Sequence, residues 1–516
     1  MAQNVITITN TAEIFCGKLY QVYENFYREV ISMMKNFRRV CLALLILILG
    51  VSSSEAVTKY QFLSQLLYVR GLDWSGSPEY NAQDPGGWML RTGYVTDDVE
   101  KFDSPVTRRE ALRWCIECLG LNFEADLLND YPTGFDDAGA LTDFERGCLV
   151  VATNMTPALF AKSNMFYGSN ELTRTESDAI LSRVKQASSG FRLDMIRNPL
   201  TGLRVYVHRH GVPTGVPTWR VYVYGLKDRE TANNVRSLLR IQQIDSSVMG
   251  AGGSYGVRTS KLEDYNIVRR FRAFLDFRGY KYKILPSMTN PNTRILPKFW
   301  VLLTIDPTHW RIRPIASHGG PEGLSPLSYI SSFNGAGAAI NGGFFAITKG
   351  GRGYPIGALR VSGRDIGELY EGRGCLGWND NDEAVFSVPH GGLSDWYDMS
   401  NIIQAGPLLL NNGYPSTAEE DFQTAFTASR HPRSAVGLNE SGQWVFMIVD
   451  GRNGMHSSGS TINELTEILK AYKVTSALNL DGGGSTELII AGRIYNSPSD
   501  GYERSISYGL GAVPIE

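Results

Sequence analysis

Residues 476–486 read SALNLDGGGST, in which an apolar run leads into a carboxylate and three consecutive glycines. The run is typical of a buried strand, and Asp481 stands at its end. Glycine is conformationally costly, so Gly482–Gly484 indicate a positive φ or a close approach of the backbone to another group. Their bare N–H groups, followed by the hydroxyl of Ser485, could form a nest for an anion. The alternative is a tight Asp-Gly turn at a strand end.

Three further polar clusters lie in the same part of the chain, each at the end of an apolar strand or at the start of a helix. GAAINGGFFA presents Asn341, and SGSTINELTEILKAYKV places Glu464 at a helix start. The third cluster, SRHPRSAVGLNESGQWVFMIVDGR, holds His431, Arg433, Asp450 and Arg452. Strand ends and the loops that follow them are where sites are assembled on a rigid scaffold. The four clusters together therefore predict one site.

Taken together, the clusters resemble the phosphodiester glycosidase family over residues 297–516. N-G-G-F-F, R-H-P-R-S-A-V-G, V-D-G-R, the glutamate-bearing helix and N-L-D-G-G-G-S occur in the family's order. One departure is Thr486-Glu487-Leu488, where relatives commonly carry a Ser/Thr-rich run that ends in methionine. The resemblance implies a C-terminal mixed α/β domain that cleaves a sugar from a sugar-phosphodiester.

Cleavage of a C1–O bond with a phosphate leaving group sets the roles that this resemblance implies. Glycosidases use two carboxylates, so Asp481 and Glu464 are the candidates for nucleophile or general base. Arg433 is suited to clamp the phosphate bidentately, with support from the N–H groups of Gly482, Gly483 and Gly484. Asn341 is expected to orient sugar hydroxyls. The further substrate-binding candidates are Ser485, His431, Asp450 and Arg452.

Several of these residues have a structural alternative. Asp450 could begin a hairpin turn or form an internal ion pair with Arg452 that holds the loop. Glu464 stands three residues after Thr461 and could be its capping partner. His431 precedes a proline and could be a loop residue without a proton to move. No cofactor is assigned, and a divalent cation near Asp481 is left open, because no ligand spacing in the sequence requires one.

The N-terminal region carries a targeting pattern. Residues 35–56 read KNFRRVCLALLILILGVSSSEA, with a positive segment, a short apolar segment and a small-x-small cleavage site. This pattern predicts a signal peptide, since an apolar run of about a dozen residues is too short for a bilayer span of ~20. Residues 1–32 are interpreted as an upstream extension, so that 1–56 is extension plus signal. The alternative is an uncleaved anchor. Either way the protein is predicted to be exported to the periplasm, the cell envelope or the extracellular space.

Residues 95–187 contain two similar segments, which begin at Val106 and Leu172. Both read hydrophobe-Thr-Arg-x-Glu and continue as an apolar helix. Each predicts a capping box, Thr107 with Glu110 and Thr173 with Glu176. With the intervening Phe-x-Asp segment, the region resembles the α-helical S-layer homology module, its first copy truncated. That resemblance implies binding to a cell-wall polymer, and the alternative is a generic pair of helical hairpins.

Residues 203–287 are predicted to form one domain, in which residues 219–287 follow the order β-α-β-β-α-β, the ferredoxin-like pattern. The order resembles the SPOR type of peptidoglycan-binding domain, a small α+β module. His208 and His210 lie two apart on a predicted strand and share a face; they are predicted to face solvent, with a metal-binding pair as the alternative. A Pro/Asn-rich linker at 286–299 separates this module from the C-terminal domain.

Four cysteines follow the predicted signal peptide: Cys115, Cys118, Cys148 and Cys375. Cys115 and Cys118 form a C-x-x-C on a helical pattern, without the turn or the second ligand pair that a redox or zinc site requires. They are predicted to be small buried hydrophobes, and a disulfide from Cys148 to one of them is left open.

The 516-residue chain is long enough for three or four domains, and its net charge of -2 argues against nucleic-acid binding through bulk charge. The sequence thus predicts a multidomain exported hydrolase that cleaves sugar-1-phosphodiester or related glycosidic bonds in envelope or extracellular glycans. Its partners would be that substrate and a cell-wall polymer or peptidoglycan. The alternative is a non-catalytic envelope protein that binds cell-wall glycan.

Overall fold

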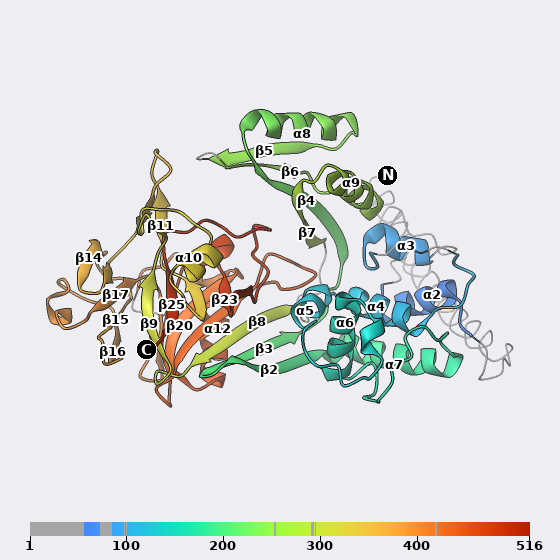
Figure 1. Cartoon of the computed structure of the whole chain (residues 1–516), viewed down its shortest axis with the longest axis horizontal. Coiled ribbons are helices and arrows are strands. Elements are labelled where there is room, and N and C mark those ends of the chain that lie inside the picture. The colour runs from blue at the N-terminus through green and yellow to red at the C-terminus, as the bar shows by residue number, and fades with distance from the viewer. Residues whose placement is uncertain are drawn as a thin grey trace, which may run out of the picture. The chain divides into compact units, whose positions relative to one another are not determined.

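The computed structural model describes residues 56–72, 85–96, 99, 101–251, 254–289, 294, 296–417 and 420–515 (Figure 1). The predicted upstream extension and signal peptide lie outside these residues, except for Ala56. None of the helices in the described ranges is long and apolar enough to cross a bilayer.

An antiparallel sheet joins strands from the middle of the chain, β1 to β3, to strands of the C-terminal part. Nine strands of the described residues form it, in the order β1-β2-β3-β8-β21-β20-β22-β18-β19. Their bounds are β1 Met155–Thr156, β2 Arg192–Leu200, β3 Leu203–His210, β8 Lys298–Ile305, β18 Leu408–Asn411, β19 Tyr414–Pro415, β20 Arg433–Asn439, β21 Trp444–Val449 and β22 Val474–Asn479. Strands β8 and β21 are almost wholly apolar and buried, which places them at the centre of the core.

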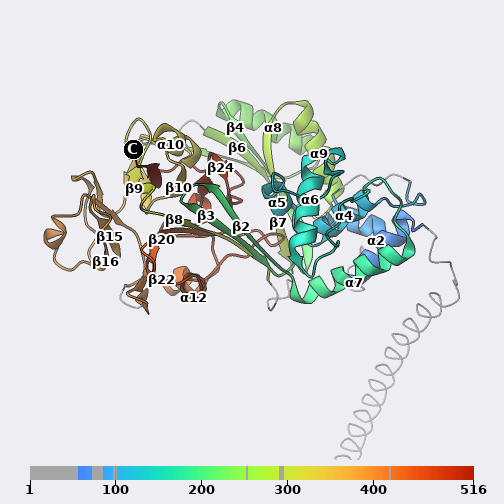
Figure 2. The ribbon, with the colours of Figure 1, turned by 60° about the horizontal axis from the view of Figure 1, so that its bottom comes forward.

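The nine-stranded sheet is covered on both faces. Helix α12 (Ile462–Ala471) packs its apolar side on one face, over β20 and β22 (Figure 2). A second antiparallel sheet packs on the other face, in the order β24-β23-β10-β25-β9. Its bounds are β9 Trp310–Ile315, β10 Ala338–Asn341, β23 Leu488–Ile490, β24 Arg493–Ile494 and β25 Gly509–Pro514. Helix α10 (Leu327–Phe333) covers the outer side of this second sheet.

The expected mixed α/β domain is therefore a β-rich domain with few helices. A further antiparallel sheet has the order β14-β13-β17-β15-β16, and β11 pairs with β12. Their bounds are β11 Phe345–Ile347, β12 Gly353–Pro355, β13 Leu359–Val361, β14 Arg364–Gly367, β15 Cys375–Trp378, β16 Ala384–Ser387 and β17 Asn401–Gln404, and the short helix α11 spans Thr424–Ala428. Short strands joined by tight turns produce this antiparallel architecture, because parallel strands require long crossovers.

The predicted small α+β module has the expected order of elements but begins later. Strand β4 (Val216–Leu226) is followed by α8 (Arg229–Ile241), β5 (Ser246–Ala251), β6 (Ser254–Thr259), α9 (Tyr265–Phe277) and β7 (Lys281–Thr289). The sheet order is β5-β6-β4-β7, as in ferredoxin-like folds. The predicted start at residue 203 is wrong, because β3 pairs with β8 along its whole length, from Leu203↔Ile305 to His210↔Lys298.

The helical region confirms one predicted capping box and adds a third copy of the repeat. Thr107 and Glu110 cap α4 (Arg108–Cys118), and α7 (Arg174–Gly190) begins directly after Thr173. Helix α2 (Lys59–Val69) has the same box at Thr58. The other helices of the region are α3 Pro85–Thr92, α5 Asn122–Leu127 and α6 Asp143–Asn154.

Backbone hydrogen bonds join the three repeats in a closed ring. Val57 donates to Leu172 O over 3.1 Å, Leu172 donates to Val106 O over 2.8 Å, and Val106 donates to Val57 O over 2.8 Å. The three segments that lead into the capped helices therefore meet at one point. The sequence prediction of two copies was incomplete.

The four cysteines in the described part of the chain are buried and unpaired, as expected for small hydrophobes, and no disulfide joins Cys148 to the C-x-x-C. The histidine pair differs from the prediction. His208 is 5% exposed and stacks on Trp300 at a ring distance of 3.7 Å, so it does not face solvent. Its Nδ1 lies 2.6 Å from Asp194 Oδ1, and its Nε2 lies 3.0 Å from His210 Nδ1. Trp300 covers the pair because β8 lies beside β3.

Candidate functional site

The predicted residues of the site converge because strand pairing brings their strand ends together. Arg433 begins β20 opposite Val449, the last residue of β21, and Asp450 follows directly. Ala435 of β20 pairs with Asn479, the last residue of β22, and Asp481 follows two residues later. The ends of β20, β21 and β22, which carry these residues, therefore lie in one region.

Asn341 joins the second sheet to this region and holds the turn at Asp481. Its Nδ2 donates to Asp481 O over 2.7 Å, and its Oδ1 accepts hydrogen bonds from Ser434 Oγ at 2.6 Å and Glu487 N at 3.2 Å. The Asp481 N–H in turn donates to Gly342 O over 3.1 Å. Asn341 is 1% exposed, so it positions the turn from within and does not reach out to a sugar hydroxyl.

At each of the three glycines, an added Cβ would be too close to a different group. A Cβ on Gly482 would lie 2.7 Å from Pro432 O. Gly483 has φ +64°, and a Cβ there would lie 3.1 Å from the guanidinium nitrogens of Arg452. A Cβ on Gly484 would lie 2.2 Å from both Arg504 Nη2 and Asp500 Oδ2. The glycines therefore allow Pro432 and the charged side chains of Arg452, Arg504 and Asp500 to pack directly on the backbone of the turn.

The expected anion nest is only partly present. The Gly482 N–H donates to Asp481 Oδ1 over 2.8 Å, and the Gly483 N–H donates to Pro432 O over 3.1 Å. Because these two donors are used within the protein, they cannot also bind a phosphate. Positive charge at the turn comes instead from Arg452 and Arg504.

The carboxyl group of Asp481 lies partly buried beside these cations. Burial raises its pKa above the ordinary range, and the hydrogen bonds from Ser485 and Gly482 and the charges of Arg504 and Arg452 oppose that shift. A carboxylate near two guanidinium groups and a hydroxyl can act on an electrophilic carbon while a cation holds an anionic group.

Arg504 and Asp500 were not predicted from the sequence. Arg504 Nη2 lies 2.6 Å from Asp500 Oδ2, and its Nη1 donates to Ser485 Oγ over 3.4 Å. The pair lies in the loop between β24 and β25 and packs on Gly484. The i,i+4 spacing of opposite charges in SDGYER was the available signal, but it did not indicate contact with a glycine turn twenty residues earlier.

Arg433 is held within the protein. Its Nε donates to Ser460 O over 3.1 Å, and its Nη2 donates to Phe426 O over 2.6 Å and to Ser429 O over 3.0 Å. It is 1% exposed, and burial together with Arg452 lowers its pKa to about 10. These contacts make it a support of the site and leave Arg452, which is exposed, as the cation available to a ligand.

His431 pairs with Ser460, and Glu464 lies four residues after Ser460, at the start of α12. His431 exchanges two backbone hydrogen bonds with Ser460, and burial followed by the charges of Arg433 and Arg452 lowers its pKa. Glu464 Oε2 accepts from Thr461 N over 3.0 Å, and Thr461 Oγ1 accepts from Glu464 N over 3.1 Å.

The contacts of Glu464 favour the capping interpretation. Its carboxylate also pairs with Lys298 at 3.2 Å and with Arg430 at 2.6 Å. Burial would raise its pKa, but the Thr461 N–H and the two cations outweigh that effect and lower it. Glu464 therefore stays ionised at the start of α12, where a carboxylate also stabilises the helix dipole.

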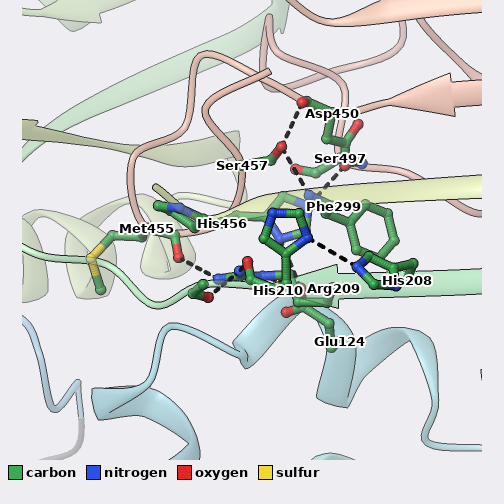
Figure 3. Close-up of polar contacts among 12 residues, drawn as sticks. Glu124, His208, Arg209, His210, Phe299, Asp450, Met455, His456, Ser457 and Ser497 are labelled. Carbon is green, nitrogen blue, oxygen red and sulfur yellow. Dashed lines mark hydrogen bonds and ion pairs between the residues drawn. The ribbon is translucent and has the colours of Figure 1, made fainter. Parts of the chain in front are cut away.

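Asp450 is 1% exposed. It lies beside His456 and Ser497 (Figure 3). Its Oδ2 accepts from Ser497 N over 2.8 Å and lies 2.9 Å from His456 Nε2, and its Oδ1 accepts from Asn496 Nδ2 over 3.1 Å. No ion pair joins it to Arg452 among the described residues. The ion pair between Asp450 and Arg452 that the sequence suggested is therefore absent, and Asp450 instead contacts His456 and the segment after β24.

Glu487 and Glu503 are neighbouring carboxyl groups. From the sequence, Glu487 was assigned no role and Glu503 was not considered. Glu487 is 2% exposed, and burial followed by the neighbouring carboxyl group of Glu503 raises its pKa to about 10. Ser328 Oγ donates to Glu503 Oε2 over 2.8 Å. The charge of Lys283, on β7, lies near enough to both to oppose the shift.

The raised pKa of Glu487 predicts that the stability of the fold depends on pH. Because its pKa is higher in the folded state than in the unfolded chain, the folded protein binds more protons, and stability falls as the pH rises from about 4.5 towards 10. Glu487→Gln should remove this fall, by at most about 1.4 kcal/mol per pH unit. Chemical unfolding at several pH values measures it. Parallel curves for the wild type and the variant would contradict the raised pKa.

No group of three or more His, Cys, Asp or Glu side chains in the described ranges is arranged to hold a metal ion. Asp481 faces arginines, which is an arrangement that favours an anion over a cation.

Comparisons with known proteins agree with the C-terminal motifs. Residues 334–513 match the phosphodiester glycosidase family model. N-acetylglucosamine-1-phosphodiester alpha-N-acetylglucosaminidase from Bos taurus is 27% identical over 215 residues, which cover 38% of this chain and 40% of the bovine protein. The SPbeta prophage-derived uncharacterized protein YomE from Bacillus subtilis (strain 168) is 33% identical over 106 residues, 20% of this chain and 16% of YomE.

The chain thus spans less than half the length of these curated relatives. Among solved structures, the catalytic domain of the zebrafish N-acetylglucosamine-1-phosphodiester alpha-N-acetylglucosaminidase, auto-inhibited by its pro-peptide, has a TM-score of 0.37 at 21% identity. That alignment covers 42% of this chain and 77% of the zebrafish chain. A proposed exported protein from Burkholderia pseudomallei K96243 has a TM-score of 0.44 at 16% identity, over 63% of this chain and 97% of that chain.

Proposed function

We propose that the C-terminal part of this chain hydrolyses sugar-1-phosphodiesters by cleaving the bond between C1 of the sugar and the phosphate oxygen. The observation that supports this most directly is the grouping of one partly buried carboxylate, Asp481, with Arg452 and Arg504 around Gly483 and Gly484. The match of residues 334–513 to phosphodiester glycosidases supports the same chemistry.

The proposed mechanism divides the work between the carboxylate and the arginines. Arg452 binds the phosphate, since guanidinium groups pair well with phosphate oxygens. Arg504 is held by Asp500 through its Nε and Nη2 and adds positive charge beside the turn. Both cations stabilise the charge that develops on the phosphate as it leaves. Asp481 acts at C1 as the nucleophile or as the base for water. A phosphate monoester is a good leaving group, so a general acid contributes less than in an ordinary glycosidase. Asn341 and Arg433 hold the turn and the strand end in place.

The test follows the oxygen of the attacking water. The full chain is incubated in ¹⁸O-water with N-acetylglucosamine-1-phosphomethyl ester and with UDP-N-acetylglucosamine, with and without chelator. Mass spectrometry should find ¹⁸O in the free sugar and none in the released phosphate compound. Label in the phosphate compound would show cleavage of the P–O bond and a different enzyme class. Release of no sugar, with glycan still bound, would favour the non-catalytic binding protein.

Export and attachment to the cell wall are further proposals that rest on the sequence patterns alone. The signal-like pattern at residues 35–56, the S-layer homology-like repeats and the ferredoxin-like module, whose order resembles SPOR domains, support them. The N-terminal residue of the protein recovered from its host distinguishes cleavage after Ala56 from an uncleaved segment.

A further inference from the structure

A carboxylate of the helical region is buried against the C-terminal part of the chain. Glu124 lies on α5 and is 0% exposed. Its Oε1 lies 2.9 Å from Arg209 Nε on β3 and 3.1 Å from His456 Nδ1, in the loop after β21 (Figure 3). Arg209 also donates to the backbone oxygens of His210 and Gly211, which fixes it on its own strand. Glu124 thus meets one cation from the sheet and one from the loop.

His456 connects Glu124 to Asp450. With Nδ1 on Glu124 and Nε2 2.9 Å from Asp450 Oδ2, both ring nitrogens face carboxylates. Burial alone would lower the pKa of His456, but the two carboxylates outweigh it and raise the pKa. The rings of Phe123 and Phe299 lie 4.6 and 4.7 Å from the imidazole ring and keep it in place.

Asp450 is linked to the Asp481–Thr486 turn through Asn496. Asn496 Nδ2 donates both to Asp450 Oδ1 over 3.1 Å and to Thr486 O over 2.9 Å, and Asn496 Oδ1 accepts from Leu488 N over 3.0 Å. Thr486 ends the turn that begins at Asp481. The Ser497 N–H, held by Asp450 Oδ2, starts the segment that leads to Arg504.

We propose that Glu124 is a positioning residue for the candidate site, which acts through His456 and Asp450 on the Asp481–Thr486 turn and on the segment that carries Arg504. The helical region is then a structural part of the hydrolase and more than an attachment module. The inference deepens the proposed function and rests on it for its kinetic consequence, but the structural link can be measured without any substrate. A displacement of about 1 Å at a catalytic group can lower a rate about 100-fold, so a remote support of this kind has a measurable effect.

The test compares two carboxylates of the same helical region. Glu124→Gln keeps the shape of the side chain and removes the charge that faces His456. Asp130→Asn is the control, because Asp130 pairs with Arg197 on β2 at 2.7 Å and with Arg493 on β24 at 3.0 Å without contacting Asp450. Both variants therefore lose ion pairs between the helical region and the sheets, but only the first lies on the path to the site.

Two readouts separate positioning from general destabilisation. Hydrogen–deuterium exchange should speed up in peptides covering 450–460, 481–487 and 496–504 in Glu124→Gln and stay at the wild-type rate there in Asp130→Asn. Turnover per folded molecule should fall about 10- to 100-fold in Glu124→Gln and change less than about 2-fold in Asp130→Asn. If Glu124→Gln does not fold, Glu124→Gln with Arg209→Gln leaves no unpaired buried charge on Arg209 and is measured in its place.

The outcomes are distinguishable. Unchanged exchange in those three peptides, with unchanged turnover per folded molecule, would overturn the positioning role. Faster exchange there, in a protein whose wild type releases no sugar from any tested phosphodiester, would retain the structural link and overturn the proposed function.

Discussion

Asp481→Asn is expected to lower the turnover of a sugar-1-phosphodiester about 100- to 10,000-fold while the protein stays folded. The side chain of asparagine can still accept the hydrogen bond from the Gly482 N–H, which Asp481 Oδ1 accepts over 2.8 Å. The turn is also held through its backbone, by Asn341 Nδ2 on Asp481 O and by the Asp481 N–H on Gly342 O. The substitution therefore removes the charge with little effect on the geometry. Initial rates and circular dichroism measure the two effects separately.

Glu464→Gln is the matched control, since the sequence predicted both carboxylates for catalysis. Glutamine also forms a capping box with Thr461, so the start of α12 should be retained. Loss of the pairs with Lys298 and Arg430, which are partly exposed, should cost about 1 kcal/mol or less. Turnover should remain within about 3-fold of the wild type. Equal losses in both variants would show that Glu464 takes part in the chemistry after all.

Sequence reasoning succeeded where the determinant is local. Thr107 with Glu110 lies within one helical turn, so the three-residue spacing is enough to predict the cap that the structure shows. The same spacing gave the capping alternative for Glu464. The third copy of the repeat, at Thr58, was not predicted, because Gln61 stands where the other two copies have glutamate.

Contacts between distant segments were not predictable in the same way. The alternation of Leu203, Val205 and Val207 predicts a strand, but it carries no information on which strand lies beside it. The pairing of β3 with β8 changed the domain boundary and buried His208 against Trp300. The contact of Arg504 with Gly484 and the path from Glu124 to Asp450 likewise depend on tertiary packing.

The roles within the site also depended on burial. Residue types suggested that Arg433 would bind phosphate, but the sequence does not show that three backbone oxygens already accept from its Nε and Nη2. Arg452, two residues after the buried Asp450, has φ +59° and stays exposed beside Gly483. The sequence motif therefore does not distinguish a supporting cation from an exposed one, and that distinction required the structure.

Gly147→Ala is expected to destabilise the protein by about 2 kcal/mol. Gly147 lies on α6, and a Cβ at this position would lie 1.8 Å from Ala125 O and 2.6 Å from Ala125 C on α5. A contact this short with backbone cannot be relieved by rotating a side chain, so the two helices must separate. Overpacking costs typically 1–3 kcal/mol and occasionally more, which outweighs the gain of roughly 1 kcal/mol from replacing a helical glycine. Thermal unfolding followed by far-UV circular dichroism measures the change.

Gly190→Ala is the control, because Gly190 is also helical and a Cβ there would have no atom within 4 Å. It should be neutral or stabilising by up to about 1 kcal/mol. Ala125 directly follows Glu124, so a shift of α5 in Gly147→Ala should also disturb the contact with His456 and lower turnover per folded molecule. A destabilised Gly147→Ala protein with full turnover would mean that α5 can move without affecting Asp450, which would weaken the positioning role of Glu124. A Gly147→Ala protein as stable as Gly190→Ala would contradict the close packing of α5 on α6.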